Sequence, residues 1–205
     1  MNAGLPLYPA GSLLLLDTPE SGSEMRFEPS APATSVMTDF RVRGTLTVPP
    51  FRPIDEALSD MRHAGVRALF VTAAQGLMVG FITSYDIQGE RPIRFLQSAD
   101  CLQERCARSY ILVADIMTPV RDLKVLHIND ALNATAGELA DTFKITALTH
   151  LVVVEEIHDG GGMRVRALFS RTRLERMTGL KIEALCTAQS FGDVEQVLTH
   201  HDCSC

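Results

Sequence analysis

The sequence predicts an α/β (α+β) protein made of two β-α-β-β-α repeats that pack as a pseudo-two-fold pair. One observation is that a segment with helical periodicity is followed by two short apolar runs separated by a turn, and that this order occurs twice. The other is that matching residues of the two copies lie 80–87 positions apart. Two copies of about 65 residues are too few for a solenoid but enough for a packed pair.

The first copy is centred on a predicted helix. Ile54–His63 has apolar residues at 54, 57, 58 and 61, the spacing of one helix face, and Gly65 is expected to end the helix. The other predicted elements are strands at Thr45–Val48, Val66–Thr72 and Leu77–Thr83, a turn at Ala73–Gly76 that joins the last two strands as a hairpin, and a helix from Ser84 onward.

The second copy is recognised by its spacing from the first. The strand Arg67–Val71 falls on Thr149–Val153 at an offset of 82, and Phe81–Thr83 falls on Leu168–Ser170 at an offset of 87. A rival alignment of IDEAL (54–58) with INDAL (128–132) has an offset of 74 and puts an eight-residue gap between a helix and the strand it packs on. Insertions belong in loops, so we predict that Asn129–Thr135 is the insertion.

These elements divide the chain into five expected segments. They are an irregular N-terminal arm (1–32), a first repeat (33–100), a linker (101–112), a second repeat (113–178) and a C-terminal helical tail (179–205). The arm is rich in Pro, Gly and Ser, and the tail contains the amphipathic run Phe191–Leu198.

Composition excludes several classes of protein. A chain of 205 residues with 46% hydrophobic residues and a mean hydropathy of +0.10 can bury a core, which argues against disorder. A net charge of −6 argues against a nucleic-acid partner. The apolar run Leu13–Leu16 is too short to span a membrane, so we expect no membrane partner and a cytoplasmic location. Five irregularly spaced cysteines fit a reducing compartment, and Cys101 and Cys106 are expected to be ordinary half-buried thiols.

The stretch GFITSYD (80–86) ends the first repeat with a hydroxyl, Thr83, and an acid three residues later, Asp86. One interpretation is structural, because Thr at a helix start with an acid at the third helical position is a variant of the capping box. The other is a ligand site, because free N–H groups at a helix start suit a phosphate and a carboxylate can accept from both hydroxyls of a ribose. The isolated heptad favours capping, whereas its place in a repeated unit favours the ligand.

Taken together, these features resemble tandem CBS domains, named after cystathionine β-synthase. The resemblance rests on SVMTDF (35–40), DIMTPV (115–120), the β-α-β-β-α order and GFITSYD, and it covers roughly residues 33–178. The chain is similar to small bacterial proteins built only of this module. The resemblance implies two repeats packed through their sheets, a homodimer, and clefts between repeats that bind AMP, ADP, ATP or S-adenosylmethionine, with the hydroxyl on phosphate and the acid on ribose.

The resemblance also assigns residues to two clefts. The first would contain Gly80, Thr83 and Asp86, completed by Thr118, Pro119, Val120, Thr149 and His150. The second would contain Ser170 and Arg173, completed by Thr38, Val66, Arg67 and Ala68. His150 could contact a base or a phosphate, or be a plain strand-end histidine.

The second copy departs from the pattern, because Ala167 replaces the glycine and Arg173 replaces the acid. Arginine has donors only and cannot accept from a ribose hydroxyl. We therefore expect the two clefts to differ, with the Asp86 cleft the better nucleoside site. The other cleft would stay empty or use Arg171 and Arg173 on phosphates, unless both arginines only form a solvated helix face.

No nucleophile–base signature or phosphate-binding loop is present, so we expect no enzymatic activity. The leading hypothesis is a regulatory module that senses an adenine nucleotide or adenosyl ligand and alters an unidentified partner protein. The alternative is a scaffold that dimerises through the same sheets with empty clefts. A weaker alternative is a redox or metal sensor using the terminal HHDCSC (200–205), for which we expect no metal site because a terminal hexapeptide lacks a fixed tetrahedral scaffold.

Overall fold

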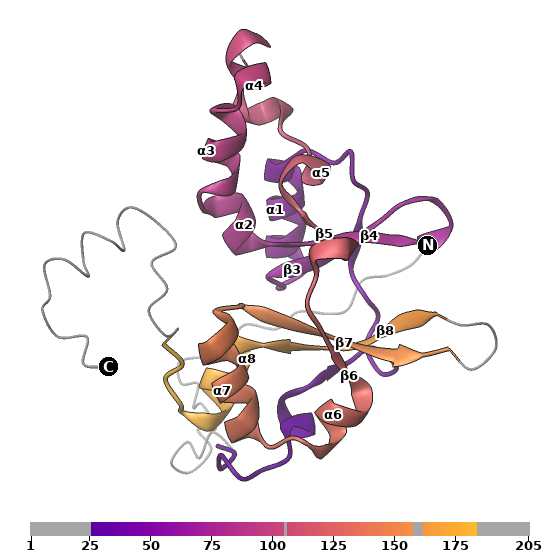
Figure 1. The fold of residues 1–205 in the computed structure, drawn as a ribbon, viewed down its shortest axis with the longest axis vertical. Helices are drawn as coiled ribbons and strands as arrows, with labels where there is room; N and C mark the ends of the chain where they lie inside the picture. Colours follow the sequence, from indigo (N-terminus) through magenta and orange to yellow (C-terminus); the bar gives the residue numbers. More distant parts are fainter. Residues whose placement is uncertain (1–25, 105, 158–161, 184–205) are drawn as a thin grey trace, which may run out of the picture.

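Two α/β halves are stacked so that their sheets face each other and their helices lie outside (Figure 1). The structure is a computed structural model, and it describes residues 26–104, 106–157 and 162–183. The upper half in Figure 1 contains β3–β5 with α1, α2, α3 and α5, and the lower half contains β6–β8 with α6, α7 and α8. The predicted pair of α/β repeats is therefore confirmed.

From the N-terminal end of the described chain to α4, the elements are, in chain order, η1 (Ala33–Val36), β1 (Thr38–Asp39), β2 (Thr47–Val48), α1 (Ile54–His63), β3 (Ala68–Thr72), η2 (Ala74–Gly76), β4 (Met78–Thr83), α2 (Ser84–Gln88), α3 (Arg91–Leu96) and α4 (Ala99–Glu104). Those that follow are η3 (Arg108–Tyr110), α5 (Val113–Ile116), β5 (Thr118–Pro119), η4 (Val120–Asp122), β6 (Val125–His127), α6 (Ile128–Asn133), α7 (Ala136–Thr146), β7 (His150–Glu156), β8 (Met163–Ser170) and α8 (Arg171–Thr178).

The two sheets exchange their outer strands. One sheet has the order β2-β3-β4-β5 and the other β1-β8-β7-β6. β1 belongs to the first repeat in the sequence but pairs with β8 of the second, with Thr38 opposite Leu168. β5 belongs to the second repeat but pairs with β4 of the first, with Phe81 opposite Thr118. The segments SVMTDF (35–40) and DIMTPV (115–120) therefore each contain a short strand that completes the sheet of the other repeat. The repeated segments indicated a duplication of the fold, but they did not indicate that the two sheets exchange strands.

The alignment at an offset of 82 is confirmed by the helices. α1 begins at Ile54 and α7 begins at Ala136, and each is followed by an antiparallel pair of strands. The residues after these helices also correspond, because Gly65 and Ala147 both adopt positive φ, at 65° and 54°. The predicted insertion contains most of a short helix, α6, which begins at Ile128. Thr135 then caps α7 through a reciprocal pair of hydrogen bonds with Glu138.

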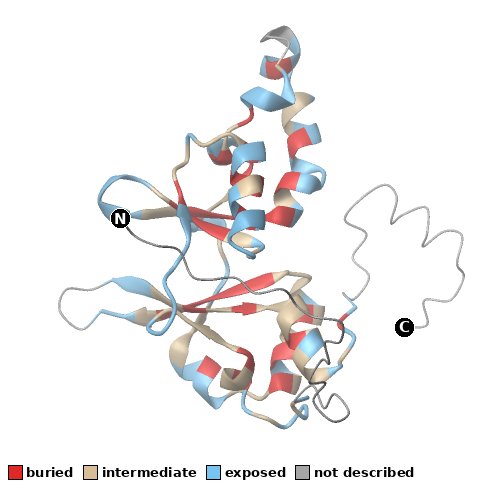
Figure 2. Cartoon of the chain, turned by 180° about the vertical axis from the view of Figure 1, so that it is seen from behind, coloured by how far each residue is buried: buried red, intermediate tan, exposed pale blue. Residues whose placement is uncertain are grey.

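The core has three parts (Figure 2). Each sheet packs its outer face against its own helices, around Ile54 and Met61 in the first half and around Phe143 in the second. The third part lies between the sheets and consists of Phe70, Phe81, Val152 and Val154, with Phe40 and other half-buried side chains against them. Aromatic rings fill its centre, and the Phe70 ring centroid lies 5.4 Å from that of Phe40 and 5.2 Å from that of Phe81.

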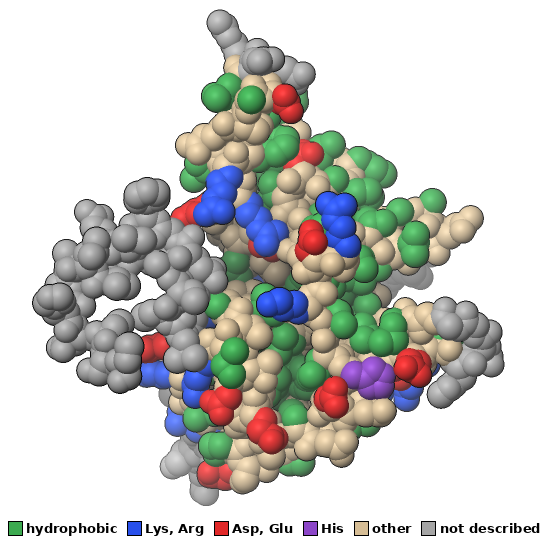
Figure 3. All heavy atoms as spheres, viewed as in Figure 1, with side chains coloured by type: hydrophobic (Ala, Val, Ile, Leu, Met, Phe, Trp, Pro, Cys, Tyr) green, Lys and Arg blue, Asp and Glu red, His purple; other side chains and the backbone are tan. Residues whose placement is uncertain are grey.

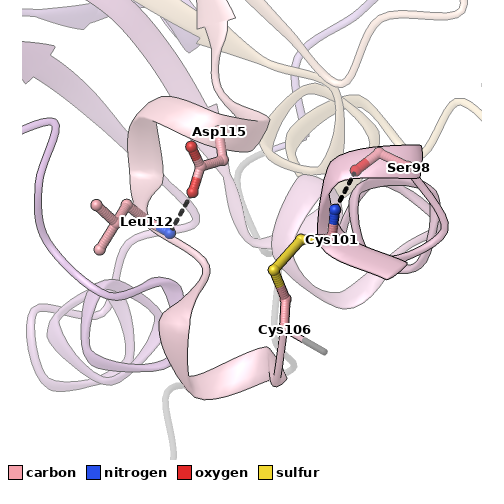
Figure 4. Close-up of a disulfide and its surroundings, with 5 residues drawn as sticks. All are labelled: Ser98, Cys101, Cys106, Leu112 and Asp115. Carbon is pink, nitrogen blue, oxygen red and sulfur yellow. Dashed lines mark hydrogen bonds between the residues drawn. A yellow bond between two sulfur atoms is a disulfide. The ribbon is translucent and has the colours of Figure 1, made fainter. Parts of the chain in front are cut away.

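The expectation of two free thiols was wrong. Cys101 in α4 and Cys106 in the following loop are joined by a disulfide that closes the loop behind the helix (Figure 4). Cys101 is buried and its N–H donates to the Ser98 hydroxyl across 3.4 Å. A sequence separation of five residues suits two cysteines where the chain reverses direction after a helix. Helical periodicity alone does not indicate such a reversal.

Several expectations lie outside the described residues. They are most of the N-terminal arm (1–25), the Phe191–Leu198 helix and the His/Cys terminus. Among the helices that the structure does describe, none is long and apolar enough to cross a bilayer.

Candidate functional site

Thr83 and Asp86 form the predicted capping box at the start of α2. The Thr83 N–H and hydroxyl donate to one Asp86 carboxylate oxygen across 2.8 and 2.7 Å, and the Asp86 N–H donates back to the Thr83 hydroxyl across 3.2 Å. The second carboxylate oxygen lies 3.1 Å from Nε of Arg91. The acid is therefore engaged on both oxygens by groups of the chain itself.

Arg91 also joins α3 to β5. Its Nη1 donates to the Ile116 carbonyl across 2.8 Å and to the Thr118 hydroxyl across 3.0 Å. Thr118, which was predicted to complete the Asp86 cleft, is thus tied to the same guanidinium as the acid. Lys and Arg side chains gather over α2, α3 and β5 on the face shown in Figure 3. A hollow of about 480 Å³ there is lined by Arg91, Thr118 and Pro119, among others.

Gly80 has a packing role at this edge. A methyl group added there would lie 2.9 Å from the Thr118 carbonyl oxygen and would collide with the Met117 side chain. Glycine thus allows β5 to approach β4, where Gly80 is paired with Pro119. This contact gives the glycine of the GFITSYD stretch a structural reason that does not depend on a ligand.

We expect Gly80→Ala to lower the free energy of unfolding by about 1–3 kcal/mol, because the exchanged strand must shift to admit the methyl group. Gly44→Ala is the matched control, since an added methyl at Gly44 meets nothing within 4 Å, and it is expected to change stability by no more than about 0.5 kcal/mol. Urea denaturation of both variants measures the difference. Equal stabilities would contradict the packing role.

A second pocket, of about 410 Å³, opens between the repeats where β8 runs into α8. It is called the Ser170 pocket here. All six residues predicted for this cleft line it. They are Thr38, Val66, Arg67, Ala68, Ser170 and Arg173. Ser170 is the N-cap of α8, yet its side chain makes no capping hydrogen bond, in contrast to Thr83. Its hydroxyl is therefore available to a ligand at the start of the helix.

Arginines dominate the polar lining of the Ser170 pocket. Four of them, Arg43, Arg67, Arg173 and Arg176, border it, and none of the described lining residues is acidic. Arg67 comes from the first repeat, and its Nη1 donates to the hydroxyls of Tyr85 and Thr172 at 3.2 and 3.3 Å. Arg173 donates from Nε to the Val36 carbonyl across 3.1 Å. Desolvation and the nearby charges of Arg43 and Arg176 lower the pKa of Arg173.

His150 lies in the Ser170 pocket instead of completing the Asp86 cleft as expected. It begins β7 opposite Ser170 and is 8% exposed. Its Nδ1 is 3.0 Å from the Thr149 hydroxyl, and its ring packs edge-on against Phe81, with centroids 6.0 Å apart. Burial, together with the charges of Arg67 and Arg171, lowers the pKa of His150 to about 4. The ring is therefore neutral at pH 7.

The predicted residues thus separate into two groups. Those of the Ser170 cleft converge on one pocket, together with His150, whereas Thr83, Asp86, Val120 and Thr149 are not among its lining residues. Sequence reasoning missed Arg43 and Arg176. Arg176 lies three residues after Arg173 and so on the same helix face, a signal that could have found it. Arg43 lies in the loop between β1 and β2, and only the strand exchange brings it to the pocket.

The fold and the cleft define a pair of α/β repeats with a ligand-sized pocket between them. The family model described as the CBS domain matches residues 34–91, from η1 to the start of α3. No curated protein sequence matches the chain. Residues 34–91 therefore match a CBS domain, and the order of elements in this domain recurs at residues 117–178.

Two solved structures with TM-scores of 0.50 support the same fold. An uncharacterized conserved protein from Pyrococcus horikoshii is 23% identical with a TM-score of 0.50, and the match covers 78% of this chain and 100% of that one. A protein from Methanocaldococcus jannaschii is 20% identical with a TM-score of 0.50, covering 71% and 49%. CBSX2, a CBS-pair protein of Arabidopsis thaliana solved in complex with AMP, is 21% identical with a TM-score of 0.48, covering 71% and 94%.

Proposed function

We propose that this chain is a non-catalytic regulatory module that binds an adenine nucleotide or an adenosyl ligand in the Ser170 pocket. The observation that carries the proposal is the convergence on one pocket of the six residues that the family resemblance assigns to one ligand cleft. The pocket volume of about 410 Å³ lies within the range of small-molecule sites.

The lining of the pocket includes groups suited to the base and to the phosphate of a nucleotide. Phe40, Leu46, Val66, Phe70 and Leu168 supply apolar surface against which a base can pack. Ser170 and Arg173, at the start of α8, supply a hydroxyl and a guanidinium for phosphate, and the first N–H groups of the helix add partial positive charge.

Ligand binding would affect how the repeats pack, because the lining comes from both of them. Val66 and Arg67 belong to the first repeat, and Ser170 and Arg173 belong to the second. A ligand that contacts both sides favours whichever arrangement of the two sheets it binds more tightly. In our proposal this shift alters the surface offered to a partner protein, and the active species is a homodimer.

A thermal-shift screen against AMP, ADP, ATP and S-adenosylmethionine tests the proposal. A ligand present at about 100 times its Kd is expected to stabilise the chain by about 2.7 kcal/mol. Ser170→Ala should weaken binding by about threefold to tenfold, the value of one lost hydrogen bond. The matched control is Ser59→Ala, on the exposed face of α1, which should bind as the unmodified chain does. Absence of a shift with all four ligands would reject nucleotide sensing.

One observation favours the alternative, a scaffold with empty clefts. Asp86 is occupied by Thr83 and Arg91, so the acid expected to hold a ribose is not open to one in this arrangement. The same screen separates the two functions, because a scaffold shows no stabilisation by any of these ligands. That Asp86 lies in the better nucleoside site stays a prediction, for which Asp86→Ala is the direct test.

A further inference from the structure

Among the residues that the structure describes, the lining of the Ser170 pocket combines four guanidinium groups with no carboxylate. This composition narrows the class of ligand further than the nucleotide class alone. Arg43 comes from the loop after β1, Arg67 precedes β3, and the other two lie one turn apart on α8. The cations therefore approach from three separate segments. A ligand that neutralises all four cations must carry negative charges that are spread along the pocket and not concentrated at one point.

Within the described residues, none of these four arginines forms an ion pair. Two of them are held in place by neutral groups instead. Arg67 is oriented by Tyr85 and Thr172, and Arg173 by the Val36 carbonyl. Each of these contacts uses one nitrogen of the guanidinium, which leaves further N–H groups for an anion. Fixed arginines lose less side-chain freedom when they bind, so they are suited to bidentate contacts with phosphate oxygens.

The crowding of like charges is itself a reason to expect an anion. Arg43 and Arg176 lie close enough to lower the pKa of Arg173, so the three cations repel one another in the free protein. His150, which also lines the pocket, is neutral at pH 7 and adds no charge. A phosphate group carries about −1.5 to −2 charges at pH 7, so a monophosphate balances about half of the four cations. A chain of three phosphates balances them all.

Among the described residues that line the pocket, none carries a carboxylate that could accept from both hydroxyls of a ribose. The position that carries Asp86 in the first repeat is occupied by Arg173 in the second, and arginine cannot accept from ribose hydroxyls. We propose that the Ser170 pocket recognises a polyphosphate chain, as in a nucleoside triphosphate, and does not recognise the ribose 2′ and 3′ hydroxyls. This inference rests on the function proposed above and names the ligand class of the same site.

Calorimetric titration of the full chain at fixed ionic strength tests the inference with five probes. They are ATP, 2′,3′-dideoxy-ATP, AMP, S-adenosylmethionine and inorganic tripolyphosphate. ATP is expected to bind at least about tenfold more tightly than AMP, since one lost charge-assisted contact costs about that factor. Dideoxy-ATP is expected to bind within about twofold of ATP, and tripolyphosphate to compete with it, because neither uses a diol.

Variants assign these effects to the pocket. Arg176→Ala should weaken ATP by about tenfold or more, whereas Arg121→Ala, an exposed arginine outside the pocket, should leave it unchanged. Arg173→Asp places an acid at the third helical position. It should weaken ATP and make the site distinguish ATP from dideoxy-ATP.

The outcomes separate this inference from the proposed function. If AMP or S-adenosylmethionine binds as tightly as ATP, or if removal of both hydroxyls weakens ATP by tenfold, nucleotide sensing stands and the polyphosphate inference is wrong. If tripolyphosphate binds and no adenine compound does, the polyphosphate inference stands and adenine sensing is wrong. If none of the five probes binds, both are wrong.

Discussion

Replacing Phe70 with alanine is expected to lower the free energy of unfolding by about 3–5 kcal/mol, the range for removing a buried aromatic ring. Phe70 is 6% exposed and lies between the two sheets, where it touches Phe40 and Phe81. Its loss leaves a cavity at the contact that holds the repeats together. We therefore expect urea unfolding of this variant to separate into two transitions, one for each repeat.

Phe143→Ala is the matched control for this experiment. Phe143 is fully buried, but it lies in the helical core of the second repeat and not between the sheets. This variant should lose a similar free energy and still unfold in one transition. If Phe70→Ala costs less than about 1 kcal/mol, or if Phe143→Ala is the variant whose transition splits, the inter-sheet cluster is not what couples the repeats.

Acidification is expected to destabilise the chain through His150, before most carboxylates titrate. The folded-state pKa of His150 is about 4, below its ordinary value of 6.5. The unfolded chain therefore binds a proton more readily between these values, so stability is complete above about pH 6.5 and falls as pH falls toward 4. The slope is about 1.4 kcal/mol per pH unit, and the full effect is about 3 kcal/mol.

His150→Gln is expected to abolish this slope, because glutamine does not titrate. His63→Gln, at an exposed helix position, should keep it. Denaturation at pH 7.5, 6.5 and 5.5 is the appropriate measurement. Asp39 and Glu155 also have lowered pKa values, through hydrogen bonds with arginines and despite desolvation, so their stabilising effect is lost only below pH 4.5. Parallel slopes in the unmodified chain and in His150→Gln would show that the buried imidazole is not the cause.

The local features of the fold were predictable from sequence. Helix α1 has the bounds that periodicity predicts, Ile54–His63. The strands β3 and β4 begin and end within two residues of their predicted limits. The correspondence of α1 with α7 was also predictable, because a helix and the strand packed on it keep their spacing. These features depend on neighbours along the chain, which periodicity and turn residues record.

The features that were not predictable depend on contacts between distant segments. By sequence, the Thr83–Asp86 pair fits both a helix cap and a ligand site. Only the contact with Arg91 shows that the acid has a charged partner within the chain. His150 was expected in the Asp86 cleft but lines the Ser170 pocket, because the sequence indicates its position in a strand but not which sheet edge lies opposite. Arg43 reaches the Ser170 pocket through the exchange of β1, for which a two-residue strand leaves no periodic signal.

The exchange of lead-in strands has a consequence for the time course of folding. β1 is made early, yet its partner β8 is made near the end of the described chain. The second sheet can therefore close only after nearly the whole module has left the ribosome, and pairing between such distant segments is slow because the intervening loop must first be ordered. The first sheet, completed by β5, can close sooner. We therefore expect folding to proceed in sequence, with the Ser170 pocket assembled in its final step.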